Sequence, residues 1–366
     1  MNRRDFLAFG FATPLAIATT TAILPWLGHR ASNSALAQAA ADVPQSGYPP
    51  IIKPPRLQPG QTVGIISPAG ATFLEDQLNI VVEAVEALGL VPKVAPHVRD
   101  RYGYLAGPDQ DRAADVNAFF ADPAVAALLP IQGGWGSSRI LPYLDYETIR
   151  QNPKIITGFS DLTALLLGIH AQTGVVTFHG PNGLTAWRSP QTTYFRQVLF
   201  DGDQSIIQNN WSAEASGRLM QVDNRIRTIT PGRVQGRLIG GNLSVLSGIV
   251  GSPYMPNLDG AILFLEDVGE YIYRLDRMVT HLKLAGVFDH LAGFIFGQCS
   301  GCGPDPDYGS LTLEQVLDDH IKPLGIPAFA GAAIGHVEPV LTLPIGTEVA
   351  MDATVGSLQM VEAAVL

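Results

Sequence analysis

Ser160 stands where an apolar, strand-like stretch gives way to a helical pattern, and it could act as a nucleophile. Residues 158–162 read Gly-Phe-Ser-Asp-Leu, which matches the G-x-S-x-G turn of serine hydrolases except at its last position. Such a turn lifts the hydroxyl clear of the sheet and aims nearby backbone N–H groups at the atom that it attacks. A serine at this place is also a common helix cap, so the local pattern leaves both roles open.

A serine nucleophile needs a general base and a group that orients this base. Two later apolar stretches each end in a suitable side chain: residues 262–265 lead to Glu266, and residues 332–335 lead to His336. The order Ser160, Glu266, His336 is the order of nucleophile, acid and base in many α/β hydrolases. Because strand-end acids and structural histidines are common, the pattern by itself is a hypothesis of catalysis.

Strand-like and helix-like stretches alternate through the first half of the chain, with strand-like runs near residues 62–67, 91–95, 125–131, 154–158 and 175–178. This alternation predicts an α/β fold with a doubly wound parallel sheet, in which sites lie at the carboxyl ends of the strands. From residue 236 onward, short apolar runs punctuated by glycine and proline predict a second, strand-rich α/β domain.

The first residues resemble an export signal. Arg3 and Arg4 precede an apolar stretch that reaches about Leu27, and small residues gather before Ala37 and Ala39. This pattern is typical of a twin-arginine leader with a cleavage site, so we expect a periplasmic protein without stable membrane insertion. An uncleaved leader would instead anchor the chain in the membrane.

The expected organisation has five parts. They are a twin-arginine-type leader at 1–37, a proline-rich tether at 38–57, a nucleophile domain at 58–205, a linker at 206–235, and a C-terminal domain at 236–366 that carries the acid and the base.

Composition excludes several classes of function. The chain has a formal net charge of −10 and no cluster of basic residues, so we expect no nucleic-acid partner. No H-E-x-x-H or comparable spacing occurs, so we expect no metal and no cofactor. The only cysteines, Cys299 and Cys302, could form a small local disulfide or remain free thiols.

Five ordered blocks carry a family resemblance that covers nearly all of residues 58–366. They are residues 133–145 (GGWGSSRILPYLD), 158–164 (GFSDLTA), 240–243 (GGNL), 265–267 (LED) and 335–336 (GH). Together they resemble the LD-carboxypeptidase serine peptidases, a group that includes murein tetrapeptide carboxypeptidases and microcin C immunity peptidases.

The resemblance implies a role for each matching residue. Ser160 would be the nucleophile, His336 the general base and acid, and Glu266 the group that orients His336. The backbone N–H groups of Gly134 and Asp161 would form the oxyanion hole. The resemblance also implies an active site in the cleft between the two domains, and a homodimer.

Recognition of the substrate is less constrained by the sequence. A carboxypeptidase must hold a free carboxylate, which a guanidinium can bind through two hydrogen bonds, so Arg139, Arg274 and Arg277 are candidates. We also expect Trp135 and Asn242 to bind the substrate. Gln132 stands where the family commonly has arginine, and Trp135 stands where tyrosine is frequent.

These observations predict a serine carboxypeptidase that hydrolyses the L–D peptide bond of murein tetrapeptide stems and releases D-Ala through an acyl-enzyme. Two alternatives remain at this point. One is a peptidase that cleaves peptide–nucleotide antibiotics of the microcin C type, which act inside the cell and therefore fit an exported enzyme poorly. The other is a periplasmic peptide-binding protein without catalysis.

Overall fold

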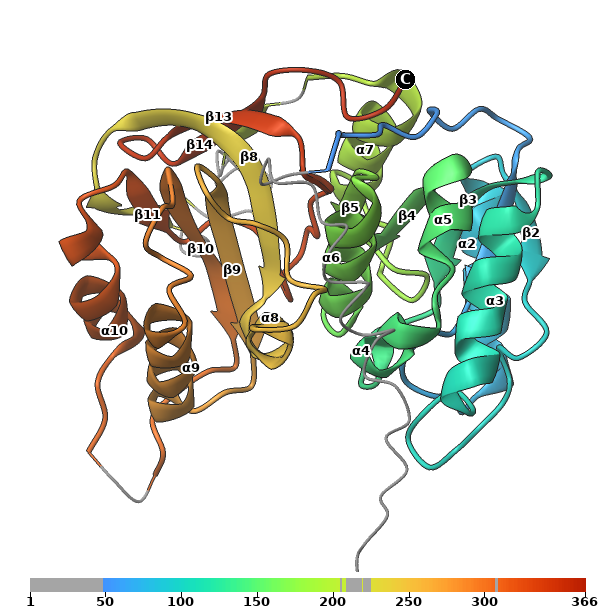
Figure 1. Ribbon diagram of the computed structural model, residues 1–366, viewed down its shortest axis with the longest axis horizontal. Coiled ribbons are helices and arrows are strands. Elements are labelled where there is room, and N and C mark those ends of the chain that lie inside the picture. The colour runs from blue at the N-terminus through green and yellow to red at the C-terminus, as the bar shows by residue number, and fades with distance from the viewer. Residues whose placement is uncertain (1–48, 205, 209–218, 220–224, 307–308) are drawn as a thin grey trace, which may run out of the picture. The chain divides into compact units, whose positions relative to one another are not determined.

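The computed structural model describes residues 49–204, 206–208, 219, 225–306 and 309–366 of the 366-residue chain (Figure 1). The expected leader and most of the expected tether therefore lie outside the described residues. Within the described ranges, no helix is long and apolar enough to span a membrane.

The first sheet has six strands in the order β12-β5-β4-β3-β1-β2. Its strands are β1 (Thr62–Ile66), β2 (Val91–Val94), β3 (Val125–Pro130), β4 (Ile155–Gly158), β5 (Thr177–His179) and β12 (Leu343–Ile345). Neighbouring strands are parallel except β12, which runs antiparallel to β5. The late strand β12 thus returns to the sheet that the first half of the chain builds.

The helices of this part pack on the sheet through apolar faces. They are α2 (Glu75–Ala87), α3 (Asp109–Ala121), α4 (Ser137–Ile140), α5 (Tyr146–Gln151), α6 (Leu162–Thr173) and α7 (Gln191–Arg196). In α2 the buried residues Leu78, Val81 and Val85 recur at intervals of three and four, which places them on one face.

The second sheet has eight strands in the order β6-β14-β13-β8-β9-β10-β11-β7. Its strands are β6 (Ile206–Gln208), β7 (Arg227–Thr230), β8 (Arg233–Asn242), β9 (Ile262–Val268), β10 (Gly293–Ser300), β11 (Ala328–Ala330), β13 (Glu348–Asp352) and β14 (Ser357–Met360). Strands β8 to β11 are parallel neighbours, and the other pairings are antiparallel. The expected linker at 206–235 contributes β6 and β7 to this sheet.

Three helices follow strands of the second sheet: α8 (Leu243–Ile249), α9 (Ile272–Leu284) and α10 (Leu313–His320). The expectation of a doubly wound parallel sheet with a second, strand-rich α/β unit is confirmed.

Helix α6 is buried on nearly all of its sides and contacts elements of both sheets (Figure 1). An apolar surface all round is what a helix needs when it packs against two layers. The Thr163 hydroxyl accepts a hydrogen bond of 2.9 Å from the backbone N–H of Asn242, at the end of β8. This contact fixes the N-terminus of α6, and the serine turn before it, against the second sheet.

Candidate active site

Ser160 occupies the turn between β4 and α6 with a φ of +65°, in the left-handed region that residues other than glycine rarely adopt. Backbone strain of this kind is often stored at functional sites. A Cβ at Gly158 would lie 2.9 Å from the side chain of Leu162, so the turn requires glycine two residues before the serine. Leu162 fills the space, and the turn forms without the second glycine of the usual pattern.

The glycine-rich turn after β3 lies directly against the serine. A Cβ at Gly133 would lie 3.0 Å from Ser160 Cβ and 3.3 Å from the backbone nitrogen of Asp161. Among the described residues, the N–H groups of Gly134 and Asp161 donate no hydrogen bond. Both donors are therefore unpaired in the turns next to Ser160, and their role as an oxyanion hole stays a prediction.

The Asp161 carboxylate holds these two turns together. Its Oδ2 accepts a hydrogen bond of 2.7 Å from the backbone N–H of Ser137, and the Ser137 hydroxyl donates to the backbone oxygen of Asp161. Burial raises the pKa of Asp161 above its ordinary value, and the bonds from Ser137 only partly oppose this. The Asp161 carboxylate thus positions the two turns that carry the N–H groups of Gly134 and Asp161, although burial disfavours its ionised form.

Replacing Asp161 with asparagine is expected to change the pH dependence of stability. Because the folded-state pKa of Asp161 is raised, the parent loses stability as the pH rises from the unfolded-state pKa through the folded-state pKa. Asparagine keeps an acceptor for Ser137 but does not titrate. The difference in Tm, variant minus parent, should be larger at about pH 8 than at about pH 4. An equal difference at both pH values would contradict this account.

Glu266 and His336 form a directly hydrogen-bonded pair. Glu266 lies fully buried near the carboxyl end of β9, and its Oε2 is 2.8 Å from His336 Nδ1 and 3.3 Å from the His336 backbone nitrogen. Gly335 has a φ of +104°, and a Cβ there would lie 2.2 Å from the same Glu266 oxygen. The Gly-His sequence is therefore needed for the imidazole to reach the carboxylate. Since Nδ1 is held, Nε2 is the nitrogen left for chemistry.

The imidazole also lies beside the serine turn. The rings of Phe159 and His336 are 5.0 Å apart in an edge-to-face arrangement, and Phe159 precedes Ser160. Within the described residues, no hydrogen bond yet joins Ser160 to His336. Catalytic hydrogen bonds are often long without substrate and tighten when substrate binds. The fold therefore places the Glu266–His336 pair beside the turn that carries Ser160, and the catalytic roles stay predictions.

Two of the residues expected to bind substrate already have partners. Arg139 makes a two-pronged contact with Asp109, with Nε 3.0 Å from Oδ1 and Nη2 2.9 Å from Oδ2. The Asn242 side chain caps α8 through Val245 and donates a bond of 3.1 Å to Asp267. Both side chains therefore stabilise the fold through these contacts, and their roles in substrate binding stay predictions.

The remaining expected substrate-binding residues are exposed. Trp135 is 67 % exposed and meets Tyr104 edge to face at 5.9 Å. Arg274 stacks on Tyr271 and Tyr273 at the beginning of α9. Arg274 Nε, however, already donates a bond of 3.2 Å to the Tyr273 hydroxyl, and the roles of both side chains in binding stay predictions.

Gln132 donates a bond of 2.9 Å to the backbone oxygen of Ala71. This position, where the family commonly has arginine, therefore supports the turn after β1.

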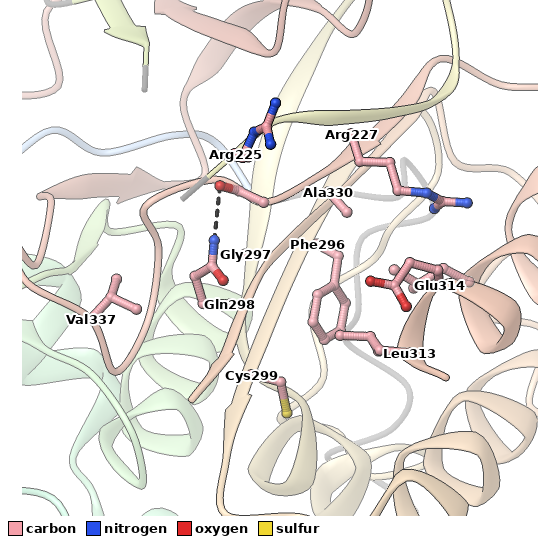
Figure 2. A pocket seen from close by; sticks show the side chains of 12 residues that line it. Arg225, Arg227, Phe296, Gly297, Gln298, Cys299, Leu313, Glu314, Ala330 and Val337 are labelled. Carbon is pink, nitrogen blue, oxygen red and sulfur yellow. Dashed lines mark hydrogen bonds between the residues drawn. The ribbon is translucent and has the colours of Figure 1, made fainter. Parts of the chain in front are cut away.

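A pocket of about 500 Å³ opens at the carboxyl ends of β10 and β11 (Figure 2). Val337, which follows His336, lines it, as do Gln298, Glu314 and Arg225. Arg225 lies in a polar stretch of the sequence without a recognisable pattern, so it is not among the residues expected to bind substrate.

Cys299 and Cys302 form a disulfide at the end of β10, which settles the choice that the sequence left open. The Cys302 sulfur accepts a bond of 3.4 Å from the backbone N–H of Glu270. The disulfide loop thus lies against the segment between β9 and α9.

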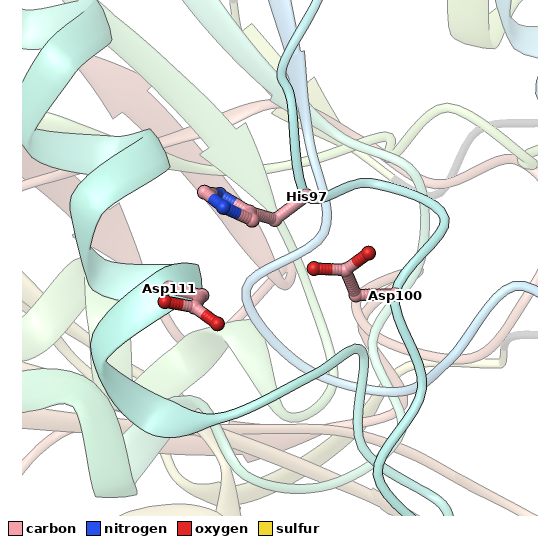
Figure 3. A group of neighbouring side chains, drawn as sticks. All are labelled: His97, Asp100 and Asp111. Atoms are coloured by element: carbon pink, nitrogen blue, oxygen red, sulfur yellow. The ribbon is translucent and has the colours of Figure 1, made fainter.

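One group of potential metal ligands lies outside this site. His97, Asp100 and Asp111 offer ligand atoms within 4.8 Å of one another (Figure 3). His97 Nδ1, however, is 2.8 Å from Asp115 Oδ1, and this hydrogen bond raises the pKa of His97. Because Asp115 already engages this ring nitrogen, and exposed acidic groups commonly gather without a metal ion, the group carries no metal assignment.

Comparison with known proteins places this geometry in a family. The model described as the LD-carboxypeptidase N-terminal domain matches residues 63–180, and the model of the LD-carboxypeptidase C-terminal domain matches residues 235–351. Together they cover more than half of the chain, and the resemblance carried by the five sequence blocks is confirmed.

Individual relatives agree with the family models. A probable murein peptide carboxypeptidase of Bacillus subtilis is 36% identical over 318 residues, 86% of this chain and 95% of the relative. The murein tetrapeptide carboxypeptidase of Pseudomonas aeruginosa is 29% identical over 302 residues, 79% of this chain and 92% of the relative. The solved structure of the microcin C7 self-immunity protein MccF with aspartyl sulfamoyl adenosine has a TM-score of 0.77 and 30% identity, covering 86% of this chain and 100% of MccF. The chain belongs to the LD-carboxypeptidase family of peptidases.

Proposed function

We propose that this protein is a serine carboxypeptidase that cleaves the L–D peptide bond of murein tetrapeptide stems and releases the terminal D-Ala. The observation that supports it most is Ser160 in a left-handed turn beside the buried Glu266–His336 pair. A strained serine between two free backbone donors and an oriented imidazole is the arrangement that acyl transfer needs.

The proposed reaction has two steps. Ser160 Oγ attacks the scissile carbonyl carbon while His336 Nε2 takes the hydroxyl proton. The N–H groups of Gly134 and Asp161 stabilise the oxyanion, an interaction worth about 3 kcal/mol per donor in comparable sites. His336 then protonates the leaving amine of D-Ala. Water, activated by the same imidazole, hydrolyses the ester and restores Ser160.

The choice of substrate rests on the relatives and on the expected leader. The relatives from Bacillus subtilis and Pseudomonas aeruginosa are named for murein peptides. The twin-arginine pattern around Arg3 and Arg4 would deliver the protein to the periplasm, beside the wall. We also propose that the protein forms a homodimer.

The pocket beside Val337 is lined by Arg225, and we propose that it holds the rest of an anionic stem peptide.

A comparison of matched peptides tests the specificity. Purified protein is incubated with a murein tetrapeptide ending in D-Ala and with the same peptide ending in L-Ala, and free alanine is quantified. We expect release from the D-Ala peptide at a rate at least about tenfold higher, a difference of about 1.4 kcal/mol in transition-state free energy. Equal rates would exclude LD specificity.

A second candidate function is cleavage of peptide–nucleotide conjugates, which the similarity to MccF favours. An aminoacyl sulfamoyl adenosine is therefore included in the same assay. Release of its amino acid without release of D-Ala from the tetrapeptide would replace the first proposal with this one.

A further inference from the structure

His179 is a buried histidine that the proposed mechanism does not use. It ends β5 beside the last residue of β4, in register with Gly158, and is 1 % exposed. Its ring meets Phe264 of β9 edge to face at 5.2 Å and Phe159 at 6.3 Å. It therefore lies between the serine turn and the strand that carries the catalytic acid.

Neither ring nitrogen of His179 has a hydrogen-bond partner among the described residues. Burial lowers the pKa of His179 to about 4, although the nearby charge of Glu266 opposes this effect. The imidazole is therefore neutral near pH 7 and carries one N–H donor. Buried donors in native proteins are almost always paired, so this one requires a partner.

Glu266 has a carboxylate oxygen that lacks a hydrogen-bond donor. Its Oε2 binds His336, whereas its Oε1 is buried and has no partner in the described part of the chain. Phe264 and Glu266 are two residues apart on β9, so their side chains point to the same face, the face that His179 contacts. An unpaired donor and an unpaired carboxylate oxygen thus face the same small space.

We propose that His179 is a positioning residue of the active site, whose imidazole N–H donates to Glu266 Oε1, directly or through one water, and fixes the carboxylate that orients His336. A bridging water is nearly as favourable as a direct bond and spans the longer separation. This role rests on the proposed triad. It gives the second carboxylate oxygen a partner and restricts its rotation.

Substitution of His179 separates positioning from packing. In His179→Leu, kcat for D-Ala release should fall about 10- to 100-fold, as for other groups that orient a catalytic side chain, with KM within about twofold. Its Tm should fall by no more than about 2 to 4 °C, because leucine keeps the apolar packing against Phe159 and Phe264 while the proposed hydrogen bond is lost. His179→Asn and His179→Gln each restore a donor at one ring-nitrogen position, and at least one should recover most of kcat.

His170 provides a matched control. It is also fully buried, with a pKa lowered to about 4, but its Nδ1 is 3.0 Å from the backbone oxygen of Val175. His170→Leu should therefore lower Tm by about 2 to 4 °C and leave kcat unchanged.

Two results would overturn the inference: an unchanged kcat in His179→Leu, or a joint fall of kcat and Tm that neither amide variant corrects. The rate of Ser160 labelling by a fluorophosphonate is measured in parallel, because it needs the triad but not the peptide. If the parent is labelled yet releases no D-Ala, the proposed substrate fails while the role of His179 is still decided by the labelling rates.

Discussion

Replacing Ser160 with alanine is expected to lower kcat for D-Ala release by about 10⁴- to 10⁶-fold. The variant keeps the binding surface and the oxyanion donors, but it cannot form the acyl-enzyme. KM should change little, because the side chain that is lost takes part in bond formation. The folded state should be little affected, since alanine keeps the Cβ and removes only a partly buried hydroxyl. Initial rates and a thermal melt check both statements.

Ser67 offers a matched control for that variant. It follows β1 at the same carboxyl edge of the first sheet, is buried, and its hydroxyl has no partner among the described residues. Ser67→Ala should retain the parent kcat and, like the parent, react with a fluorophosphonate. If Ser160→Ala were still labelled at the parent rate, the nucleophile would have to be another residue.

Replacing Gly335 with alanine is expected to lower kcat by at least about 10²-fold, although no reacting group is removed. The new Cβ would lie 2.2 Å from Glu266 Oε2 and 2.6 Å from Glu266 Cγ, closer than van der Waals contact allows. The carboxylate and the imidazole must separate to relieve the overlap. The positive φ adds a backbone cost of about 1 to 2 kcal/mol.

Gly325→Ala isolates the effect of the overlap. Gly325 also has a positive φ, +68°, but a Cβ there would meet no atom within 4 Å. Both variants should therefore lose stability through the backbone, whereas only Gly335→Ala should lose catalysis. Equal losses of kcat in the two variants would show that general destabilisation, and not displacement of Glu266, is responsible.

The parts of the site that the sequence predicts are those set by local patterns. An apolar run that ends in a polar residue indicates a strand end, and the carboxyl ends of parallel strands meet at one edge of a sheet. This reasoning located Glu266 near the end of β9 and the strained turn at Ser160, whereas the apolar run before His336 is a loop after β11, from which His336 reaches Glu266 by a hydrogen bond. Their catalytic roles stay predictions until they are measured.

The features that the sequence could not predict depend on contacts between distant residues. Strand β12 is three residues long, and nothing in its composition indicates that it pairs with β5. Arg139 has the side chain expected of a carboxylate binder, yet Asp109, 30 residues away, occupies its guanidinium. His179 carries no motif, and only its burial beside Phe264 and its unpaired nitrogens identify it.

The central claim is that Ser160 cleaves an L–D peptide bond. The most direct test measures free D-Ala released from a murein tetrapeptide by the parent protein and by Ser160→Ala, at equal concentration and with folding verified by a thermal melt. The account predicts stoichiometric release of D-Ala with formation of the tripeptide by the parent, and no release above background by the variant. Release by both proteins, or by neither when both are folded, would contradict it.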